Sequence, residues 1–284
     1  MVSDICVDGV ISGNDRFIGG VIGFFEKGLL DNCSVTGNIT GTSSSYSTGG
    51  IVGENRGTIQ NISLDNIEVA GGNDVGGIAG RSYPFVDYGG SSRTITWFSD
   101  TGIVIDCSVG KNTSISGNMA VGGLIGDNSG GIPEYYGQVT RSSSYAVVQG
   151  NSRVGVVVGA NSGKVFESYS NGYVTGDSEI GGLVGYNYGL IEDCYSLSEV
   201  NGNSKVGGLV GRNTDDIKNS YSSGKTTGTS YKGGFLGDFQ SGTIVNSYWD
   251  VETSTQPELS YYTGLTGYNT AQMIKETNSV EIYT

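Results

Sequence analysis

The sequence of 284 residues contains no histidine, and only three of its residues are proline. The absence of histidine excludes Ser-His-Asp and Cys-His nucleophile systems and histidine-based zinc or iron sites. It also removes the side chain that most often acts as a base near neutral pH. Carboxylate, tyrosine, lysine and arginine chemistry stay open. The scarcity of proline excludes collagen and a Pro/Gly-rich disordered linker.

Charge is scarce as well, and positive charge most of all. Charged residues make up 15 % of the chain, and 28 acidic residues against 15 basic ones give a net charge of −13. Because such a field repels phosphate groups, we expect no nucleic-acid partner. No stretch approaches the ~20 apolar residues of a membrane-spanning helix, so we also expect no membrane insertion.

The N-terminus lacks a basic stretch followed by an apolar run, which is the pattern of a signal peptide. Met1 leads directly into repeat-like sequence, and the chain reaches Thr284 without an obvious closing element. We therefore expect a piece cut from a longer protein whose signal lies upstream.

Glycine, in contrast, is abundant, with 50 residues. A Gly-Gly pair followed by apolar-x-Gly, or a near copy, recurs along the chain. The copies begin at Gly19, Gly49, Gly76, Gly122, Gly155, Gly181, Gly207 and Gly233. The last four are spaced by 26 residues, and the earlier steps are 30, 27, 46 and 33 residues. The chain is therefore a tandem repeat whose N-terminal half carries insertions.

Each repeat contains three short apolar or β-branched runs separated by Gly, Asn, Asp or Ser, which are strand and turn signals. A unit of this length with three strands predicts one coil of a parallel β-solenoid. We expect an all-β fold of about nine coils over residues 1–250, right-handed because parallel crossovers almost always are. A C-terminal cap or tail follows at 251–284, with one helical piece at 271–277. An antiparallel sandwich or a propeller is the alternative, but propeller blades repeat at ~40–45 residues.

This repeat resembles the GLUG motif, named for its Gly-Leu-x-Gly core. Gly182-Leu183-Val184-Gly185 and Gly208-Leu209-Val210-Gly211 match that core, and the neighbouring Asn-x-Gly and Cys/Ser-Tyr-Ser elements fit too. The resemblance covers roughly residues 5–250. It implies a bacterial or archaeal cell-surface protein and an extracellular location. The motif occurs beside adhesins, IgA-specific peptidases and unassigned envelope proteins, so it says little about biochemistry.

Stacking of coils turns aligned positions into columns. One column is asparagine, which we expect to form a structural, turn-stabilising ladder rather than a ligand site. Its members are Asn55, Asn128, Asn161, Asn187 and Asn213.

A second column, of Cys, Ser and one Ile, is expected to point inward. We place Cys6, Cys33, Cys107 and Cys194 in it. Only Cys6 and Cys33 fall on adjacent coils, so at most one disulfide can form. Four buried free thiols fit the pattern better.

The next column is aromatic and is expected to face outward by alternation. It holds Tyr169, Tyr195, Tyr221 and Tyr248. Such a strip is either a platform for sugar rings or another protein, or a row of side chains that pack on one another.

Glu167 and Asp193 stand one repeat apart in the same column and could form a carboxylate pair of the kind that glycosidases use. Their column also holds Arg141 and Asn219, so we predict no catalytic residues. The pairs Asp215-Asp216 and Asn73-Asp74 could bind calcium, but neither has the alternating acidic loop of a dedicated site. We therefore expect no cofactor, with calcium as the one candidate.

Insertions near 81–100 and 131–139 carry the strongest local signal for a ligand site, since loops that leave a solenoid often form its binding flank. Their aromatic residues either build a hairpin with its own small core or form a contact surface between the two loops. The candidate binding residues are Tyr83, Phe85, Tyr88, Trp97, Phe98, Tyr135 and Tyr136.

These observations favour a non-enzymatic, extracellular repeat domain at the cell surface. We expect it to serve in cell adhesion or as a structural stalk, with a surface glycan or a protein as partner, or with self-association. The alternatives are a polysaccharide-cleaving enzyme on a β-helix scaffold and a subunit of an extracellular filament or sheath.

Overall fold

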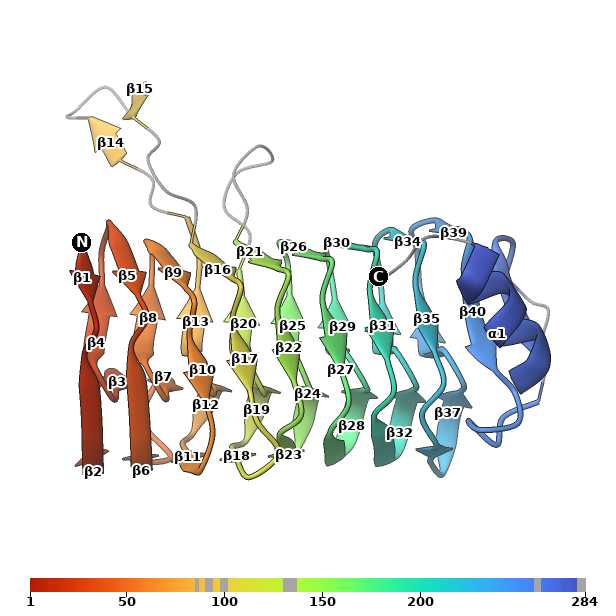
Figure 1. Ribbon diagram of the computed structural model, residues 1–284, viewed down its shortest axis with the longest axis horizontal. Helices are drawn as coiled ribbons and strands as arrows, with labels where there is room; N and C mark the ends of the chain where they lie inside the picture. The colour runs from red at the N-terminus through yellow and green to blue at the C-terminus, as the bar shows by residue number, and fades with distance from the viewer. Residues whose placement is uncertain (85–86, 90–93, 98–101, 130–136, 258–261, 280–284) are drawn as a thin grey trace.

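The computed structural model describes residues 1–84, 87–89, 94–97, 102–129, 137–257 and 262–279. Within them the chain winds into a rod of stacked coils, with the first coil at one end and the C-terminal helix at the other (Figure 1). Strands of neighbouring coils pair in parallel, so the predicted parallel β-solenoid is confirmed. No helix among the described residues has the length and apolarity needed to span a bilayer.

One regular coil contributes to four sheets. Its strands are β30 (Leu190–Glu192) in sheet 1, β31 (Tyr195–Ser196) in sheet 2, β32 (Glu199–Gly207) in sheet 3 and β33 (Val210–Asn213) in sheet 4. The sequence predicted three strands per coil, one fewer than the structure shows. Some turns lie inside polar stretches, so the sequence pattern does not separate the strands on either side of them. Asp193, with a φ of 54°, turns the backbone between β30 and β31.

Each coil contributes one strand to sheet 1. This sheet has nine described strands, which agrees with the predicted number of about nine coils. They are β1 (Val2–Ser3), β5 (Leu29–Asp31), β9 (Thr58–Gln60), β16 (Ile103–Ile105), β21 (Gln138–Thr140), β26 (Lys164–Phe166), β30, β34 (Ile217–Lys218) and β39 (Ile244–Val245).

Sheet 2 begins in the third coil. Its strands are β10 (Ser63–Leu64), β17 (Ser108–Val109), β22 (Ser143–Ser144), β27 (Tyr169–Ser170), β31, β35 (Tyr221–Ser222), β40 (Ser247–Asp250) and β41 (Leu265–Tyr268).

Sheet 3 is bent, and most coils cross it with two strands. They are β2 (Cys6–Gly13), β3 (Phe17–Gly19), β6 (Ser34–Gly41), β7 (Ser47–Gly49), β11 (Ile67–Ala70), β12 (Asn73–Gly76), β18 (Ser114–Ser116), β19 (Met119–Gly122), β23 (Val147–Gln149), β24 (Ser152–Gly155), β28 (Tyr173–Gly181), β32, β36 (Thr226–Thr227) and β37 (Ser230–Gly233). In β28 and β32 the two halves are continuous, which joins both ladders into one sheet.

Sheet 4 follows the paired glycines. It contains β4 (Ile22–Phe25), β8 (Val52–Asn55), β13 (Ala79–Ser82), β20 (Ile125–Asn128), β25 (Val158–Asn161), β29 (Val184–Asn187), β33 and β38 (Leu236–Phe239).

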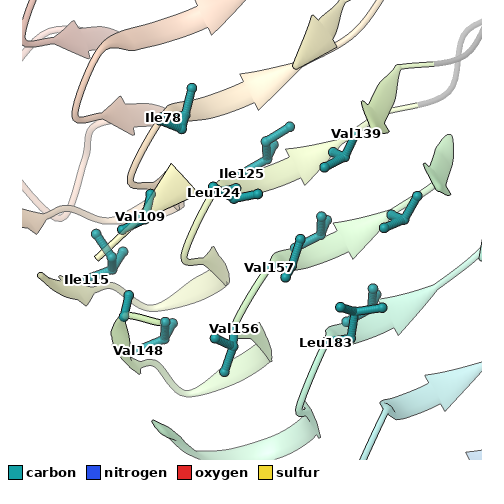
Figure 2. Close-up of a cluster of buried hydrophobic side chains, with 14 of the residues drawn as sticks. Ile78, Val109, Ile115, Leu124, Ile125, Val139, Val148, Val156, Val157 and Leu183 are labelled. Carbon is teal, nitrogen blue, oxygen red and sulfur yellow. The ribbon is translucent and has the colours of Figure 1, made fainter. Parts of the chain in front are cut away.

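Apolar side chains fill the interior in rows along the axis. Val165, Ile191 and Ile217 pair in register at steps of 26 residues and are fully buried. Figure 2 shows the same arrangement farther toward the N-terminus, where side chains such as Leu124 and Val148 meet inside the rod. Burial of each such side chain stabilises the fold by roughly 1.5–3 kcal/mol.

Glycine at the sheet 3–sheet 4 corner is required by close approach. A Cβ on Gly181 would overlap the carbonyl oxygen of Val184, and one on Gly182 would overlap Ser196 Oγ on sheet 2. The glycine corner therefore lies directly across a thin interior from sheet 2. The outer surface of the glycine corner and the outer surface of sheet 2 consequently face opposite directions.

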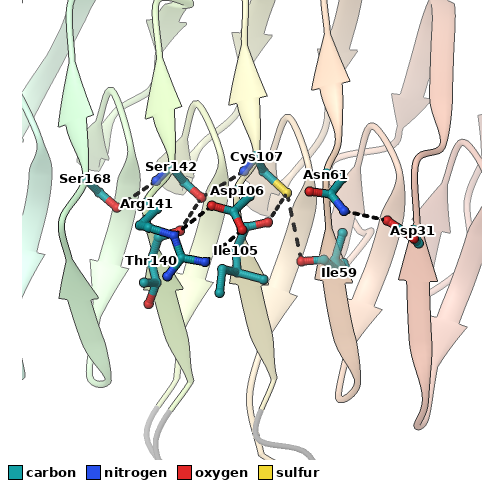
Figure 3. A network of polar contacts seen from close by, with 10 residues as sticks. All are labelled: Asp31, Ile59, Asn61, Ile105, Asp106, Cys107, Thr140, Arg141, Ser142 and Ser168. Carbon is teal, nitrogen blue, oxygen red and sulfur yellow. Dashed lines mark hydrogen bonds and ion pairs between the residues drawn. The ribbon is translucent and has the colours of Figure 1, made fainter.

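The predicted inward column of Cys and Ser forms a hydrogen-bonded corner between sheets 1 and 2 (Figure 3). The hydroxyl of Ser142 accepts the backbone N–H of Cys107 at 3.1 Å and donates to the carbonyl of Thr140 at 2.8 Å. Ser168 accepts the N–H of Ser142 in the same way, at 3.1 Å. Each coil thus satisfies a buried amide of the coil before it.

The prediction was wrong for Cys6. Val2 pairs with Leu30 and Cys6 with Ser34, so Ile5, not Cys6, lies at the level of Cys33. A one-residue offset turns a side chain to the other face of the strand. Cys6 is therefore exposed, whereas Cys33, Cys107 and Cys194 are buried, and all four thiols are free.

The C-terminal segment continues the solenoid before it ends it. β41 extends sheet 2 beyond residue 250, where the sequence placed the boundary. Helix α1 (Thr270–Ser279) then packs against β40 and β41, with Met273 buried. The helix lies at the end of the rod, where it covers the last coil (Figure 1).

Candidate functional site

The tyrosine column lies on the outer side of sheet 2, since Ser168 and Ser170 on either side of Tyr169 are fully buried. The rings of Tyr169 and Tyr195 stack with centroids 4.8 Å apart and planes 2° apart, and those of Tyr195 and Tyr221 at 5.0 Å and 3°. Tyr248 pairs in register with Tyr221 but stacks on Tyr268, with centroids 5.2 Å apart.

Stacking leaves little ring surface for a ligand in this ladder. The rings of Tyr169, Tyr195 and Tyr221 cover one another face to face, so this part of the ladder presents mainly ring edges and hydroxyl groups. Tyr145 meets Tyr169 edge-on, with their hydroxyl oxygens 2.8 Å apart. Burial raises the pKa of Tyr195 and of Tyr221, so both stay protonated. The geometry favours mutual packing over a platform for sugar rings.

The asparagine column is fully buried and forms a chain of amide hydrogen bonds. Asn128 donates to Asn161 at 2.7 Å, Asn161 to Asn187 at 2.8 Å and Asn187 to Asn213 at 2.8 Å. Asn55 donates instead to the hydroxyl of Ser82 in the third coil, at 3.0 Å. These amides have no access to an external ligand.

Glu167 and Asp193 occupy the corner that joins sheets 1 and 2. Both are in the left-handed conformation, with φ of 46° and 54°. Asp193 accepts a hydrogen bond from Asn219 at 3.0 Å, and Arg141 in the same column forms two 2.8 Å hydrogen bonds with Asp106 (Figure 3). The residues of this column therefore form the turn between sheets 1 and 2.

Neither candidate calcium position forms a metal cage. Asp216 accepts hydrogen bonds from the N–H and the hydroxyl of Thr243, and these lower its pKa. In the part of the chain that the structure describes, no group of three or more acidic or cysteine side chains is placed to hold a metal ion.

The two insertions leave the rod side by side. One follows β13 and the other follows β20, and these strands pair with Ser82 opposite Asn128 (Figure 1). Within the first insertion, β14 (Asp87–Gly89) and β15 (Thr94–Trp97) pair antiparallel, with Tyr88 opposite Ile95. Phe85, Phe98, Tyr135 and Tyr136 lie outside the described residues.

Tyr83 stands at the root of the first insertion and is held by charged side chains. Its hydroxyl donates to Glu54 at 2.6 Å and accepts from Arg56. The guanidinium groups of Arg56 and Arg81 lie over its ring, 4.6 and 5.0 Å from the centroid. This predicted residue belongs to a larger polar surface.

That surface, which we call the charged corner, consists of two columns on either side of the glycine seam between sheets 3 and 4. Sheet 3 contributes Asp74, Ala120, Arg153, Glu179 and Lys205, and sheet 4 contributes Glu54, Arg81, Asp127, Ala160, Tyr186, Arg212 and Asp238.

Glu179 is the centre of its C-terminal part. Its side chain is 9 % exposed, and the carboxylate contacts Arg153 at 3.4 Å, Lys205 at 3.2 Å and Arg212 at 3.2 Å. Arg153 and Arg212 also lie over the ring of Tyr186, at 5.3 and 5.0 Å from its centroid. Three basic groups therefore surround one buried carboxylate.

Toward the N-terminus the charged corner opens into a hollow of about 420 Å³, which we call the corner hollow. It is lined by Asp74, Arg81, Asp127, Arg153 and Tyr188, with Ser129 and Ser162. Ala120 and Ala160 also line it. They occupy column positions where the neighbouring coils carry Asp, Arg or Tyr, so two short side chains leave the space.

Two carboxyl groups of the corner hollow are perturbed. Burial, with a further contribution from Asp127, raises the pKa of Asp74 to about 7. Burial also raises the pKa of Asp127, although Ser129 donates to it at 2.8 Å and Arg81 lies 3.4 Å away. Perturbed acids in a concave site are typical of binding and catalytic positions.

Sequence reasoning missed this site. From the sequence, Asp74 was a candidate only for calcium binding, and Arg81 was only the first residue of an insertion. The available signal was the pair of alanines in columns of large polar side chains, but recognising it requires knowing that the two columns meet.

Comparison with known proteins agrees with the repeat. Residues 176–201 and 202–227 each match the sequence model of the GLUG motif. The chain thus carries GLUG-motif repeats, as predicted, and these two contain Glu179 and two of its basic partners, Lys205 and Arg212. No curated protein matches the chain.

Among solved structures, the chain is similar to a crystal structure from Bacteroides ovatus described as a "putative immunoglobulin A1 protease". The identity is 19 %, the TM-score is 0.48, and the match covers 89 % of this chain and 71 % of that one. A likeness at this level does not extend to activity.

Proposed function

We propose that this chain is an extracellular repeat domain of a cell-surface protein that serves in adhesion as a rigid rod, without enzymatic activity. The observation that carries the proposal is the uninterrupted parallel stacking of coils, with both insertions leaving from adjacent strands at one edge. A rod of this kind holds a binding flank at a distance from its anchor. GLUG-motif repeats support a place at the cell surface.

The partner would be a glycan or a protein that meets the insertions and the charged corner at their root. Tyr83 links the two, because it leads into the first insertion and is bonded to Glu54 of the corner. The tyrosine ladder would contribute stiffness, since its rings already cover one another.

The test is co-sedimentation of the purified chain with a panel of polysaccharides and cell-wall preparations, with and without calcium. Newly formed sugar ends are measured in the same samples. We expect binding without cleavage, and weaker binding when residues 84–101 are replaced by a short Gly-Ser turn. Cleavage would refute the non-enzymatic proposal, and absence of binding to every preparation would refute adhesion.

A polysaccharide-cleaving enzyme is the second candidate, and one observation favours it. Asp74 and Asp127 are two carboxyl groups that line one hollow, and glycosidases act with a pair of carboxyl groups at one site. In that case sugar ends would form with the native chain and not with Asp127→Asn.

A further inference from the structure

The corner hollow contains an acceptor that the chain itself does not use. Within the described residues, the carboxyl group of Asp74 forms no hydrogen bond or ion pair, although the residue is partly buried. The other acids of the charged corner are engaged: Glu54 by Tyr83, Asp127 by Ser129, Glu179 by three basic groups and Asp238 by Arg212. An unused carboxyl group facing a hollow is available to a ligand.

The charges around the hollow alternate in sign, and this restricts the ligand. Arg81 and Arg153 line the hollow with Asp74 and Asp127, close enough for their positive charges to act on both carboxyl groups. An isolated anion would meet two carboxyl groups, and an isolated cation would meet two guanidinium groups. A neutral ligand with hydrogen-bond donors and acceptors on adjacent atoms avoids both conflicts.

Vicinal hydroxyl groups have this property. Each hydroxyl donates one hydrogen bond and accepts others, so it can donate to a carboxylate while accepting from a guanidinium. Ser129 and Ser162 add two hydroxyls to the lining. Tyr188 stacks on Tyr186 at 3.6 Å between centroids and stays 40 % exposed, which leaves apolar ring surface at the rim for C–H groups.

We propose that the corner hollow is a saccharide-binding subsite for one or two units of a neutral glycan, with Asp74, Asp127, Arg81 and Arg153 recognising adjacent hydroxyls. Its volume of about 420 Å³ falls within the usual range of small-ligand sites. The inference rests on the proposed adhesive function, because it identifies the chemistry that the rod would meet. The subsite lies on the side of the rod opposite the tyrosine ladder.

Binding is expected to depend on pH through Asp74. The charged groups that face it are Glu54 from β8, Arg81 from β13, Asp127 from β20 and Arg153 from β24. A ligand hydroxyl that donates a hydrogen bond to this carboxyl group favours its charged form. Affinity should therefore rise as the pH rises through about 7.

The experiment begins with an array of neutral, uronic-acid and amino-sugar oligosaccharides, followed by calorimetric titration of the strongest neutral binder. Asp74→Asn and Asp127→Asn should each weaken binding about tenfold, whereas Asp193→Asn should change it less than about twofold. Asp193 is the matched control, because it is also an aspartate in the left-handed conformation and lies outside the hollow. Asp74→Asn should also abolish the pH dependence.

Ala160→Tyr tests the space itself without changing a charge. The next coil carries Tyr186 in the same column, so the position can accept an aromatic ring. Filling the hollow should abolish binding while the melting temperature stays within a few degrees of the native value. Thermal unfolding of every variant distinguishes a variant that no longer binds from one that no longer folds.

Unchanged affinity in both the filled and the aspartate variants would overturn the subsite. So would a preference for charged oligosaccharides, or the absence of any neutral binder on the array. If the subsite fails while the chain still sediments with cell walls, the adhesive function stands and another surface carries it. Cleavage that Asp127→Asn abolishes would confirm the subsite and refute the non-enzymatic function.

Discussion

Residues in the left-handed conformation mark the corners of the rod. One such column, which includes Asp193 and Asn219, joins sheets 1 and 2, and another, which includes Asp74 and Lys205, borders the glycine seam. Asp and Asn tolerate this conformation, while other residues pay roughly 1–2 kcal/mol for it. Tyr231 and Lys205 nevertheless adopt it, with φ of 48° and 53°. The paired strands on both sides of each corner hold these residues in place.

Asp74 links the charged corner to stability. Its pKa is about 7 in the folded chain against 3.8 for the ordinary carboxyl group, so between these pH values the folded state keeps a proton that the unfolded state has released. Stability must then fall as the pH rises through this window. Asn at this position fits the φ of 46° and cannot ionise.

We expect Asp74→Asn to match the native chain in stability near pH 4 and to exceed it at pH 8 by on the order of 2–4 kcal/mol. Urea unfolding of both proteins at the two pH values measures the difference. An advantage of the same size at both pH values would show that the pKa of Asp74 is not raised.

At the scale of the elements, the rod is held by ladders that run along its axis. The asparagine ladder joins sheets 4 and 1, and each amide bonds to the next coil and to its own turn. Asn187 donates to Asn213 at 2.8 Å, and its side-chain oxygen accepts from Asn161 at 2.8 Å and from the N–H of Gly189 at 3.3 Å. Such buried amides are costly to leave without partners.

Replacing Asn187 with Ala should therefore destabilise the fold by about 2–5 kcal/mol, since each buried polar group left without a partner costs ~1–3 kcal/mol. Asn203→Ala is the matched control, because Asn203 is exposed and donates a similar bond, 2.9 Å long, to Asp177. It should change the free energy of unfolding by less than about 0.5 kcal/mol. Chemical denaturation compares the two, and equal losses would contradict a special role for the buried ladder.

At the scale of the whole molecule, coils are interchangeable as long as the register is kept. Gly176 pairs with Gly202, so deletion of residues 176–201 joins Thr175 to the equivalent residue of the next coil. The shortened chain should fold cooperatively and lose one coil, about 4.8 Å of length.

Deletion of residues 176–200 is the control. It differs by one residue and turns every following side chain of the strand to the wrong face. We expect this variant to be insoluble or to lack a cooperative transition, while small-angle scattering and thermal melting show a shorter native-like rod for the first deletion. Equal behaviour of the two variants would show that register does not govern the fold.

The repeat architecture follows from the sequence alone. Glycine pairs and β-branched residues that recur at 26-residue steps can all be buried together only if identical coils stack in register, so the parallel solenoid and the number of coils are predictable. The asparagine and tyrosine columns follow for the same reason. The expected right-handed coil stays a prediction from general chirality.

The tertiary structure decided which columns meet and which way the irregular coils face. Cys6 differs from Cys33 in exposure because the first coil is offset by one residue, which no repeat pattern signals. Asp74, Asp127 and Arg153 come from three coils and from both sides of the glycine seam. They share a hollow because glycine lets sheets 3 and 4 approach closely and because two alanines leave space there. Proximity across a corner depends on backbone geometry, and periodicity along the chain does not record it.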